Sequence, residues 1–79
     1  MSVRLFARAR DLAGADRLEL PADRLTTVAA VRAALLARYP QLGPLGPHLL
    51  AAVNSAYADE QTTIPAGSEV AFFPPVSGG

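Results

Sequence analysis

The sequence has no cysteine and no lysine, and its seven basic side chains are all arginine. Without cysteine, the chain cannot form a disulfide, a zinc–thiolate site, a thiol nucleophile or a persulfide on a side chain. Without lysine, no side chain of one copy can accept an activated carboxyl group of another copy through an isopeptide bond. There is also no run of 18 apolar residues and no signal peptide. We therefore expect a cytoplasmic protein without a membrane span.

The residues that are present indicate one small folded domain. The chain has 79 residues, and 51% of them are hydrophobic, which is too many for a disordered polypeptide. Seven arginines balance seven acidic residues, so no net charge attracts nucleic acid or a membrane surface. The composition therefore predicts no nucleic-acid partner and no membrane partner.

The last ten residues are the most informative stretch of the chain. Val70 to Phe73 alternate and are bulky, which is typical of a half-buried strand. Pro74 has no backbone N–H to donate to a sheet, so strand pairing is expected to stop there. Pro75 then holds the chain extended. We predict a folded domain over residues 1–74 and an extended tail over residues 75–79.

The tail ends in Gly78 and Gly79. A terminal carboxyl group is ionised near neutral pH and is a poor electrophile, so an enzyme must activate it, usually by ATP adenylation. Glycine has no Cβ and can enter a slot that excludes larger residues. Five extended residues span roughly 16–18 Å, which lets the domain dock outside a pocket while the carboxyl group enters it. A frayed end with two incidental glycines is the alternative, and the preceding strand and double proline favour the reactive tail. The tail positions are Pro74, Pro75, Val76, Ser77 and Gly78, with Gly79 as the reactive end.

The N-terminal half predicts two strands and one helix. Residues 3–10 alternate as a strand, and residues 11–14 are expected to form a turn in which Gly14 supplies any positive φ. Residues 17–20 alternate again and predict a second strand, paired as a hairpin. Apolar residues then recur at helical spacing, which predicts a helix over residues 28–39 with an N-cap at Thr26-Thr27.

The C-terminal half predicts three more strands. Residues 40–47 hold two Gly-Pro pairs, and we expect an irregular loop there. Strands are predicted over residues 49–53 and 56–58, with a turn at Asn54 between them, and the last strand begins at Glu69. With one crossover helix, the first and last strands can lie parallel and adjacent. This order predicts an α+β fold, the β-grasp arrangement of ubiquitin, with a mixed sheet and one main helix packed on one face.

Two stretches carry a resemblance to a known family. They are Leu49-Leu50-Ala51-Ala52-Val53-Asn54 and the run from Gly67 to Gly79, which contains Phe-Phe-Pro-Pro-Val-Ser-Gly-Gly. Both resemble the small, sulfur-carrier subunit of molybdopterin synthase, and the length and element order agree over the whole chain. That family usually has two acidic residues where this chain has Ser68 and Ala66. The difference concerns the charge of a turn and leaves the tail intact.

The resemblance implies a cycle of sulfur transfer. A ubiquitin-activating-like adenylyltransferase would use ATP to adenylate Gly79, and a sulfur donor would convert the acyl-adenylate to a thiocarboxylate. The tail would then enter the large subunit of molybdopterin synthase, where the sulfur passes to a pyranopterin precursor. The chain itself would bind no cofactor and no metal, and would serve as a sulfur-donor subunit without its own catalytic machinery.

The predicted partner-binding residues are Phe6, Phe73 and Arg8. Phe73 points away from the core if Phe72 points inward, because side chains alternate along a strand. Phe6 is outward by the alternation of the first strand, and two exposed phenylalanines on adjacent strands indicate a binding patch. Arg8, with Arg4 and Arg10, predicts either a docking surface for an acidic partner or a solubilised sheet face.

Other candidate sites are weak. His48 is the only histidine, and no cysteine or second histidine could complete a metal site with it. Asp59 and Glu60 are adjacent acids on a predicted exposed turn, where a solvated role is expected. Ser55 and Ser77 have no general base nearby in the sequence. We find no catalytic constellation, so the chemistry is expected to belong to the partners.

Two alternative functions remain open at this point. One is a sulfur carrier for a different product, such as thiazole, cysteine or a thiolated tRNA base. The other is a ubiquitin-like modifier that attaches to other proteins through Gly79. The absence of lysine weakly favours a carrier over a tag that polymerises on itself.

Overall fold

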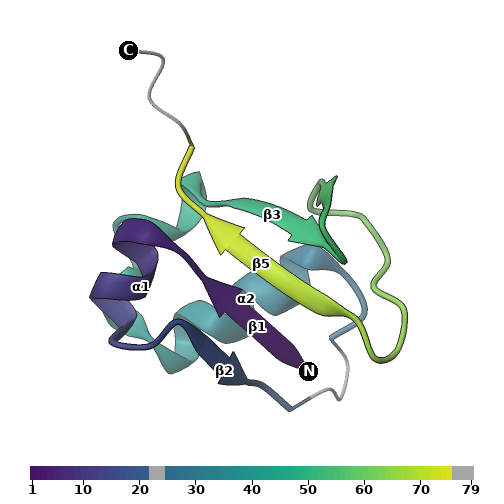
Figure 1. Ribbon diagram of the computed structural model, residues 1–79, viewed down its shortest axis with the longest axis horizontal. Coiled ribbons are helices and arrows are strands. Elements are labelled where there is room, and N and C mark those ends of the chain that lie inside the picture. The colour runs from purple at the N-terminus through teal and green to yellow at the C-terminus, as the bar shows by residue number, and fades with distance from the viewer. Residues whose placement is uncertain (22–24, 76–79) are drawn as a thin grey trace.

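The computed structural model describes residues 1–21 and 25–75, and these form a five-stranded sheet with one long helix across it (Figure 1). The strands are β1 (Ser2–Leu5), β2 (Arg17–Glu19), β3 (Leu50–Val53), β4 (Ala56–Ala58) and β5 (Glu69–Phe73). The helices are α1 (Ala7–Ala13), α2 (Val28–Arg38) and two short 3₁₀ helices, η1 (Pro40–Leu42) and η2 (Gly46–His48).

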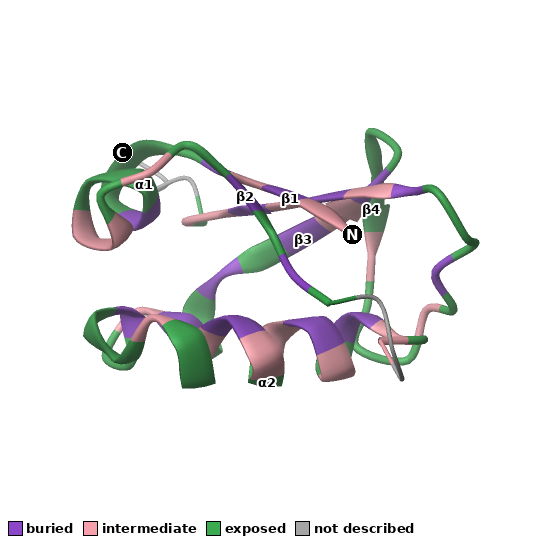
Figure 2. Ribbon diagram, turned by 90° about the horizontal axis from the view of Figure 1, so that it is seen from below, coloured by how far each residue is buried: buried purple, intermediate pink, exposed green. Residues whose placement is uncertain are grey.

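The strand order is β2-β1-β5-β3-β4, so the first and last strands of the chain are neighbours at the centre of the sheet. β1 and β5 pair in parallel, and the other neighbours pair antiparallel. Figure 2 shows the sheet and α2 as two layers, with α1 beside one end of the sheet. The predicted α+β, ubiquitin-like β-grasp arrangement is confirmed.

The core lies between the inner face of the sheet and α2. Every second residue of β1 and β5 is buried, as the period of two along a strand requires. Three apolar residues of α2, spaced three and four apart, meet them from the other layer. The largest fully buried side chains are Phe72, Leu5, Leu35, Leu42, Val3, Val28, Val31 and Val70.

The sequence signals for α2 are confirmed to within one residue. The Oγ1 of Thr27 accepts a hydrogen bond from the Ala30 N–H at 3.2 Å, which satisfies one of the free N–H groups at the helix start. The helix ends at Arg38, and Tyr39 is its C-cap, immediately before Pro40.

The predicted strand over residues 3–10 is wrong after Leu5. Residues 7–13 form α1, and Gly14, at φ +76°, is the cap of that helix and not part of a tight hairpin turn. Alternating alanine and arginine satisfy a period of two, but alanine, arginine and leucine are also good helix formers. The helix buries Ala9 and leaves Ala7 exposed, so the two residues do not share one face as the strand prediction required.

The loop predicted over residues 40–47 is also more regular than expected. Pro40 and Pro47 each lie in the first turn of a 3₁₀ helix, η1 and η2, because proline is tolerated there, where its missing N–H is not needed, and Pro44 lies in the turn between the two. Gly46 is buried, and a Cβ there would lie 2.4 Å from the Leu36 Cδ2. Because η2 ends at His48 and Leu49 is its C-cap, the third strand begins at Leu50, one residue later than predicted.

The turn between β3 and β4 is confirmed at Asn54. Asn54 and Ser55 both have positive φ, +49° and +71°, and together they form the two-residue connection of an antiparallel hairpin. That geometry matches the right-handed twist of the flanking strands. The hairpin places β4 at one edge of the sheet.

Candidate functional site

The last strand, β5, ends at Phe73, and this end of the strand is the base of the predicted tail. Phe72 is fully buried, whereas Phe73, the last residue of the strand, is only half-buried on the opposite face. The strand ends at Phe73, so the predicted stop of pairing at Pro74 is confirmed, and Pro75 is exposed. Val76, Ser77, Gly78 and Gly79 lie outside the described residues.

On the outer face of the sheet, opposite α2, one row of paired residues beside this base has small side chains in its middle. The strand register aligns Arg4, Ala71, Ala52 and Tyr57 across β1, β5, β3 and β4. The two alanines in the middle of this row are small. Larger side chains flank these alanines: Arg4 and Tyr57 at the ends of the row, Phe73 and Leu50 on the side nearer the tail, and Glu69 on the other side.

Leu50, Tyr57 and Phe73 form an apolar platform at the base of the tail. Leu50 is paired with Phe73 in the ladder and is 41% exposed. Tyr57 is 80% exposed, and its ring meets the Phe73 ring edge-on at 5.7 Å between centroids. An exposed aromatic group of this kind is typical of a protein-binding surface. The sequence interpretation missed Leu50 and Tyr57, although the alternation of residues 50–53 and 56–58 could have indicated that both face outward.

Phe6 lies at the same end of the sheet but does not belong to a strand. Leu5 pairs with Phe72, and Phe6 follows as the extended N-cap residue of α1. Its ring is 39% exposed, and the guanidinium carbon of Arg4 lies 5.1 Å from the ring centroid. Phe6 is therefore accessible, as predicted, but its neighbour is Arg4, and the ring that contacts Phe73 is that of Tyr57.

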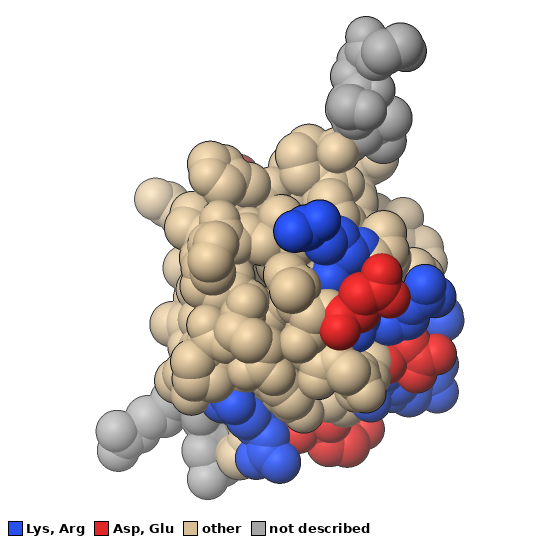
Figure 3. All heavy atoms as spheres, turned by 90° about the vertical axis from the view of Figure 1, so that its left-hand side faces the viewer, with Lys and Arg blue, Asp and Glu red and all other residues tan. Residues whose placement is uncertain are grey.

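Arg8 lies on α1, two residues after Phe6, and is exposed. Its neighbour Arg10 forms an exposed ion pair with Asp11 at 3.6 Å. Figure 3 views this end of the molecule: the charged side chains lie over the right and lower parts of the surface, with basic and acidic groups interspersed, and the upper left is nearly uncharged. Because the two signs are mixed, this face presents no extended field of one sign.

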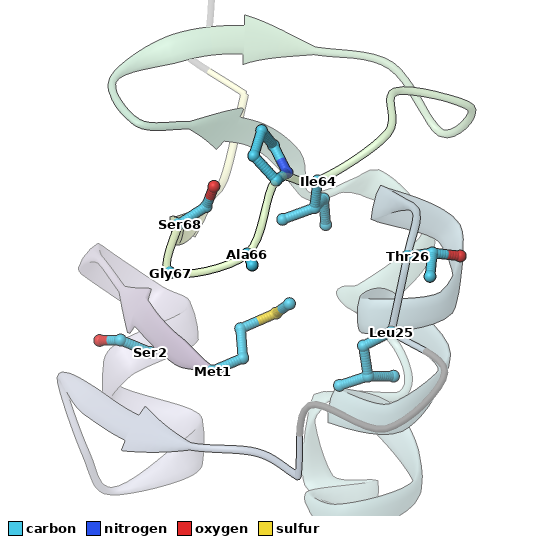
Figure 4. Close-up of a pocket in the computed structure, with 9 residues that line it drawn as sticks. Met1, Ser2, Leu25, Thr26, Ile64, Ala66, Gly67 and Ser68 are labelled. Atoms are coloured by element: carbon cyan, nitrogen blue, oxygen red, sulfur yellow. The ribbon is translucent and has the colours of Figure 1, made fainter.

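A cavity of about 370 Å³ lies at the opposite end of the sheet from the tail (Figure 4). It opens between the start of β1 and the segment that leads into β5, and Met1, Leu25, Ile64 and Ala66 contribute its apolar lining. Among residues 1–21 and 25–75, no aspartate, glutamate, histidine or arginine lines it. Within residues 1–21 and 25–75, no group of three or more histidine, cysteine, aspartate or glutamate side chains could hold a metal ion.

Three other sequence candidates, His48, Asp59 and Glu60, lie in the described part of the chain. His48 is exposed at the end of η2. The Oδ1 of Asp59 accepts hydrogen bonds from the Gln61 N–H and the Thr62 hydroxyl, both at 3.0 Å, and so closes a turn. Glu60 pairs with Arg32 of α2 through both of its carboxylate oxygens, a contact that the sequence did not reveal.

In the part of the chain that the structure describes, no helix combines the length and apolar character needed to cross a bilayer. The longest helix, α2, has 11 residues.

Comparison with known proteins agrees with the fold. The sequence profile of the ThiS family matches residues 3–79. The molybdopterin synthase sulfur carrier subunit of Escherichia coli (strain K12) is 41% identical over 81 residues, covering 100% of this chain and 99% of that protein. The corresponding protein of Haemophilus influenzae is 36% identical with the same coverage. Among solved structures, Haloferax volcanii small archaeal modifier protein 1 is similar with a TM-score of 0.77 and 29% identity over 95% of each chain.

Proposed function

The chain belongs to the ThiS family, and we propose that it is the sulfur-carrier subunit of a molybdopterin synthase. The observation that supports this role most directly is the end of β5. A strand at the centre of the sheet ends at Phe73 and is followed without a loop by two prolines, so the last residues start from a rigid base. Two relatives that match this chain over its full length are named molybdopterin synthase sulfur carrier subunits.

The reactive group in this proposal is the carboxyl group of Gly79. An adenylyltransferase would join a carboxylate oxygen to the α-phosphorus of ATP and release pyrophosphate. A donor of sulfur at the oxidation level of sulfide would then displace AMP and leave a thiocarboxylate. That thiocarboxylate holds its negative charge on a soft, nucleophilic sulfur, which the large subunit would direct at the pyranopterin precursor. ATP is used by the activating partner, and the chain itself needs no bound cofactor.

The folded part of the chain would position this group. The parallel pairing of β1 with β5 and the antiparallel pairing of β3 with β5 hold both sides of the strand that ends at Phe73. Residues 75–79, if extended, reach roughly 16–18 Å beyond it. The carboxyl group would therefore enter a partner's pocket while the domain stays outside, and the partner supplies the catalytic groups.

Docking would use the surface around the base of the tail. Phe73 belongs to the apolar platform, and Phe6 and Arg8 lie at the same end of the molecule on the other side of β5. We expect the large subunit and the adenylyltransferase to contact this surface, because both must receive the tail that leaves from it.

Mass spectrometry of the purified protein tests the proposal. The protein is incubated with the adenylyltransferase, ATP and a sulfur source, and we expect the mass change of one oxygen exchanged for sulfur at Gly79. Transfer to the pyranopterin precursor should then require the large subunit. If the protein is never loaded with sulfur under conditions that load the Escherichia coli relative with its own partners, the proposal is wrong.

The second candidate function is a ubiquitin-like protein modifier. The structural similarity to a small archaeal modifier protein favours considering it. A modifier would appear in larger covalent adducts in the same experiment, whereas a carrier shows only the sulfur exchange. A carrier for a different product would load normally and fail only when the pyranopterin precursor is the acceptor.

A further inference from the structure

Arg4 carries a charge that the fold does not neutralise. It lies at the middle of β1 on the outer face of the sheet and is half-buried. Its Nε is buried and has no hydrogen-bond partner, the only side-chain nitrogen or oxygen in this condition among the described residues. The Arg4 side chain rests on the Phe6 ring, with 5.1 Å between the guanidinium carbon and the ring centroid.

The acidic side chains of the strands on this face are already paired elsewhere. Glu69 lies 3.6 Å from the Nη2 of Arg17, and Glu19 lies 3.4 Å from the Met1 amino group. No carboxylate of the described residues lies within 4.0 Å of the Arg4 guanidinium. The residue opposite Arg4 on β2 is Arg17, and like charges in opposed positions on a sheet repel one another.

Arg32 differs from Arg4 because its guanidinium is hydrogen-bonded within the fold. Its Nε donates to both oxygens of Glu60, at 3.0 and 3.2 Å, and its Nη1 donates to the Gly46 carbonyl oxygen at 2.6 Å. It also lies over an aromatic ring, that of Phe72, with 5.3 Å to the centroid. Arg4 has the aromatic contact and lacks the carboxylate. Leaving the buried Nε of Arg4 without a hydrogen bond costs free energy of folding, and among the described residues the Phe6 ring is the one group that offsets this cost.

We infer that Arg4 is the receptor for a carboxylate side chain on the protein that docks on the outer sheet face, the large subunit of the synthase in the proposed function. The inference rests on that function and adds the chemistry of the partner's surface. The partner would present an apolar area to the platform and to Phe6, and one aspartate or glutamate to Arg4. Ala71 lies next to Arg4 in the sheet, and its small side chain leaves room for the carboxylate to approach. Charge complementarity of this kind sets the register of an interface and excludes partners that lack the acid.

Calorimetric titration with the large subunit from the same organism tests this inference. Arg4→Met keeps an unbranched side chain and removes the charge, and we expect it to weaken binding about ten- to a hundredfold at low salt. The difference from the wild type should shrink at high salt, because the lost contact is ionic. Arg38→Met is the matched control: Arg38 is exposed in the last turn of α2, in the other layer of the fold, and its loss should change affinity less than twofold.

Thermal melts of the free variants separate docking from folding. Arg4→Met should melt at or above the wild-type temperature, because it removes a buried nitrogen that has no partner.

Equal affinity of Arg4→Met and wild type for the large subunit at both salt concentrations would overturn the inference. If Arg4→Met binds like the wild type but Phe73→Asp still loses binding to the large subunit, the role of Arg4 is wrong and the proposed function stands. If the wild type does not bind the large subunit, both are wrong. A change in self-association with unchanged affinity for the large subunit would assign Arg4 to a second copy of the chain and also overturn the inference.

Discussion

Phe72 and Phe73 are consecutive residues of β5, and their side chains lie on opposite faces of the sheet. Phe72 is fully buried between the sheet and α2, whereas the Phe73 ring meets Tyr57 on the outer face. Two residues of the same type therefore have separate roles, one in folding and one at the surface from which the tail leaves.

This relationship predicts opposite effects of the same substitution. Phe72→Asp should unfold the domain, because it removes about 4 kcal/mol of core packing and leaves an unpaired charge in the core. Phe73→Asp should stay folded and weaken binding to the large subunit about 10- to 150-fold, which corresponds to 1.5–3 kcal/mol of lost apolar burial. Melting curves of both variants, with calorimetry of the folded one, are the measurements. If Phe73→Asp melts the domain and Phe72→Asp does not, the assignment of the two faces is wrong.

Tyr57 should matter for binding far more than for stability. Its side chain is 80% exposed on the edge strand β4, so Tyr57→Ala removes little buried area and only the edge contact with Phe73. We expect a loss of less than about 1 kcal/mol in the free energy of unfolding and a loss of about tenfold or more in affinity for the large subunit. His48→Ala, at an exposed position on η2, serves as the control and should change neither quantity. Unchanged affinity of Tyr57→Ala would remove Tyr57 from the docking surface.

The length of the tail should be critical for sulfur transfer. Deleting Gly79, or adding one residue after it, moves the carboxyl group by about 3.5 Å. Such a displacement is large compared with the geometry that a reacting group tolerates, so we expect no thiocarboxylate and no sulfur transfer. Thiocarboxylate formation is measured by mass spectrometry beside a thermal melt, which should be unchanged. Normal loading and transfer by the truncated protein would contradict the carrier function.

Ser55 should be replaceable by glycine with a gain in stability. Ser55 has φ +71° in the two-residue turn between β3 and β4, a conformation that costs a residue with a side chain more than glycine. We expect Ser55→Gly to raise the free energy of unfolding by about 0.5–1 kcal/mol, measured by urea denaturation with an unchanged m-value. Ser55→Ala is the control and should give no gain, since alanine has the same steric conflict. A destabilised glycine variant would show that the Ser55 side chain makes a contribution that its geometry does not reveal.

The predictable part of the fold consisted of features that local sequence encodes. Thr27 and Pro40 flank α2 because capping and the missing proline N–H act within one turn of helix. The strand at residues 69–73 and its end before Pro74 were readable for the same reason. Residues 7–13 were misread because alternating small and charged residues fit a strand and a helix equally well. The helix places Ala9 in the core, and the core residues around it belong to segments distant in the sequence. This burial favours the helix over the strand.

The sequence by itself determined the ubiquitin-like order of elements, the inward and outward sides of β5 and the Gly-Gly ending, because each depends on neighbouring residues along the chain. The tertiary structure decided which residues of different strands lie together. Leu50 and Tyr57 join Phe73 only through the register of β3 with its two neighbours. Likewise, Arg32 meets Glu60, 28 positions away, while Arg4 meets no acid among the described residues. The pairing of a charge depends on where the folded chain brings its partners, and no local pattern of residues encodes that position.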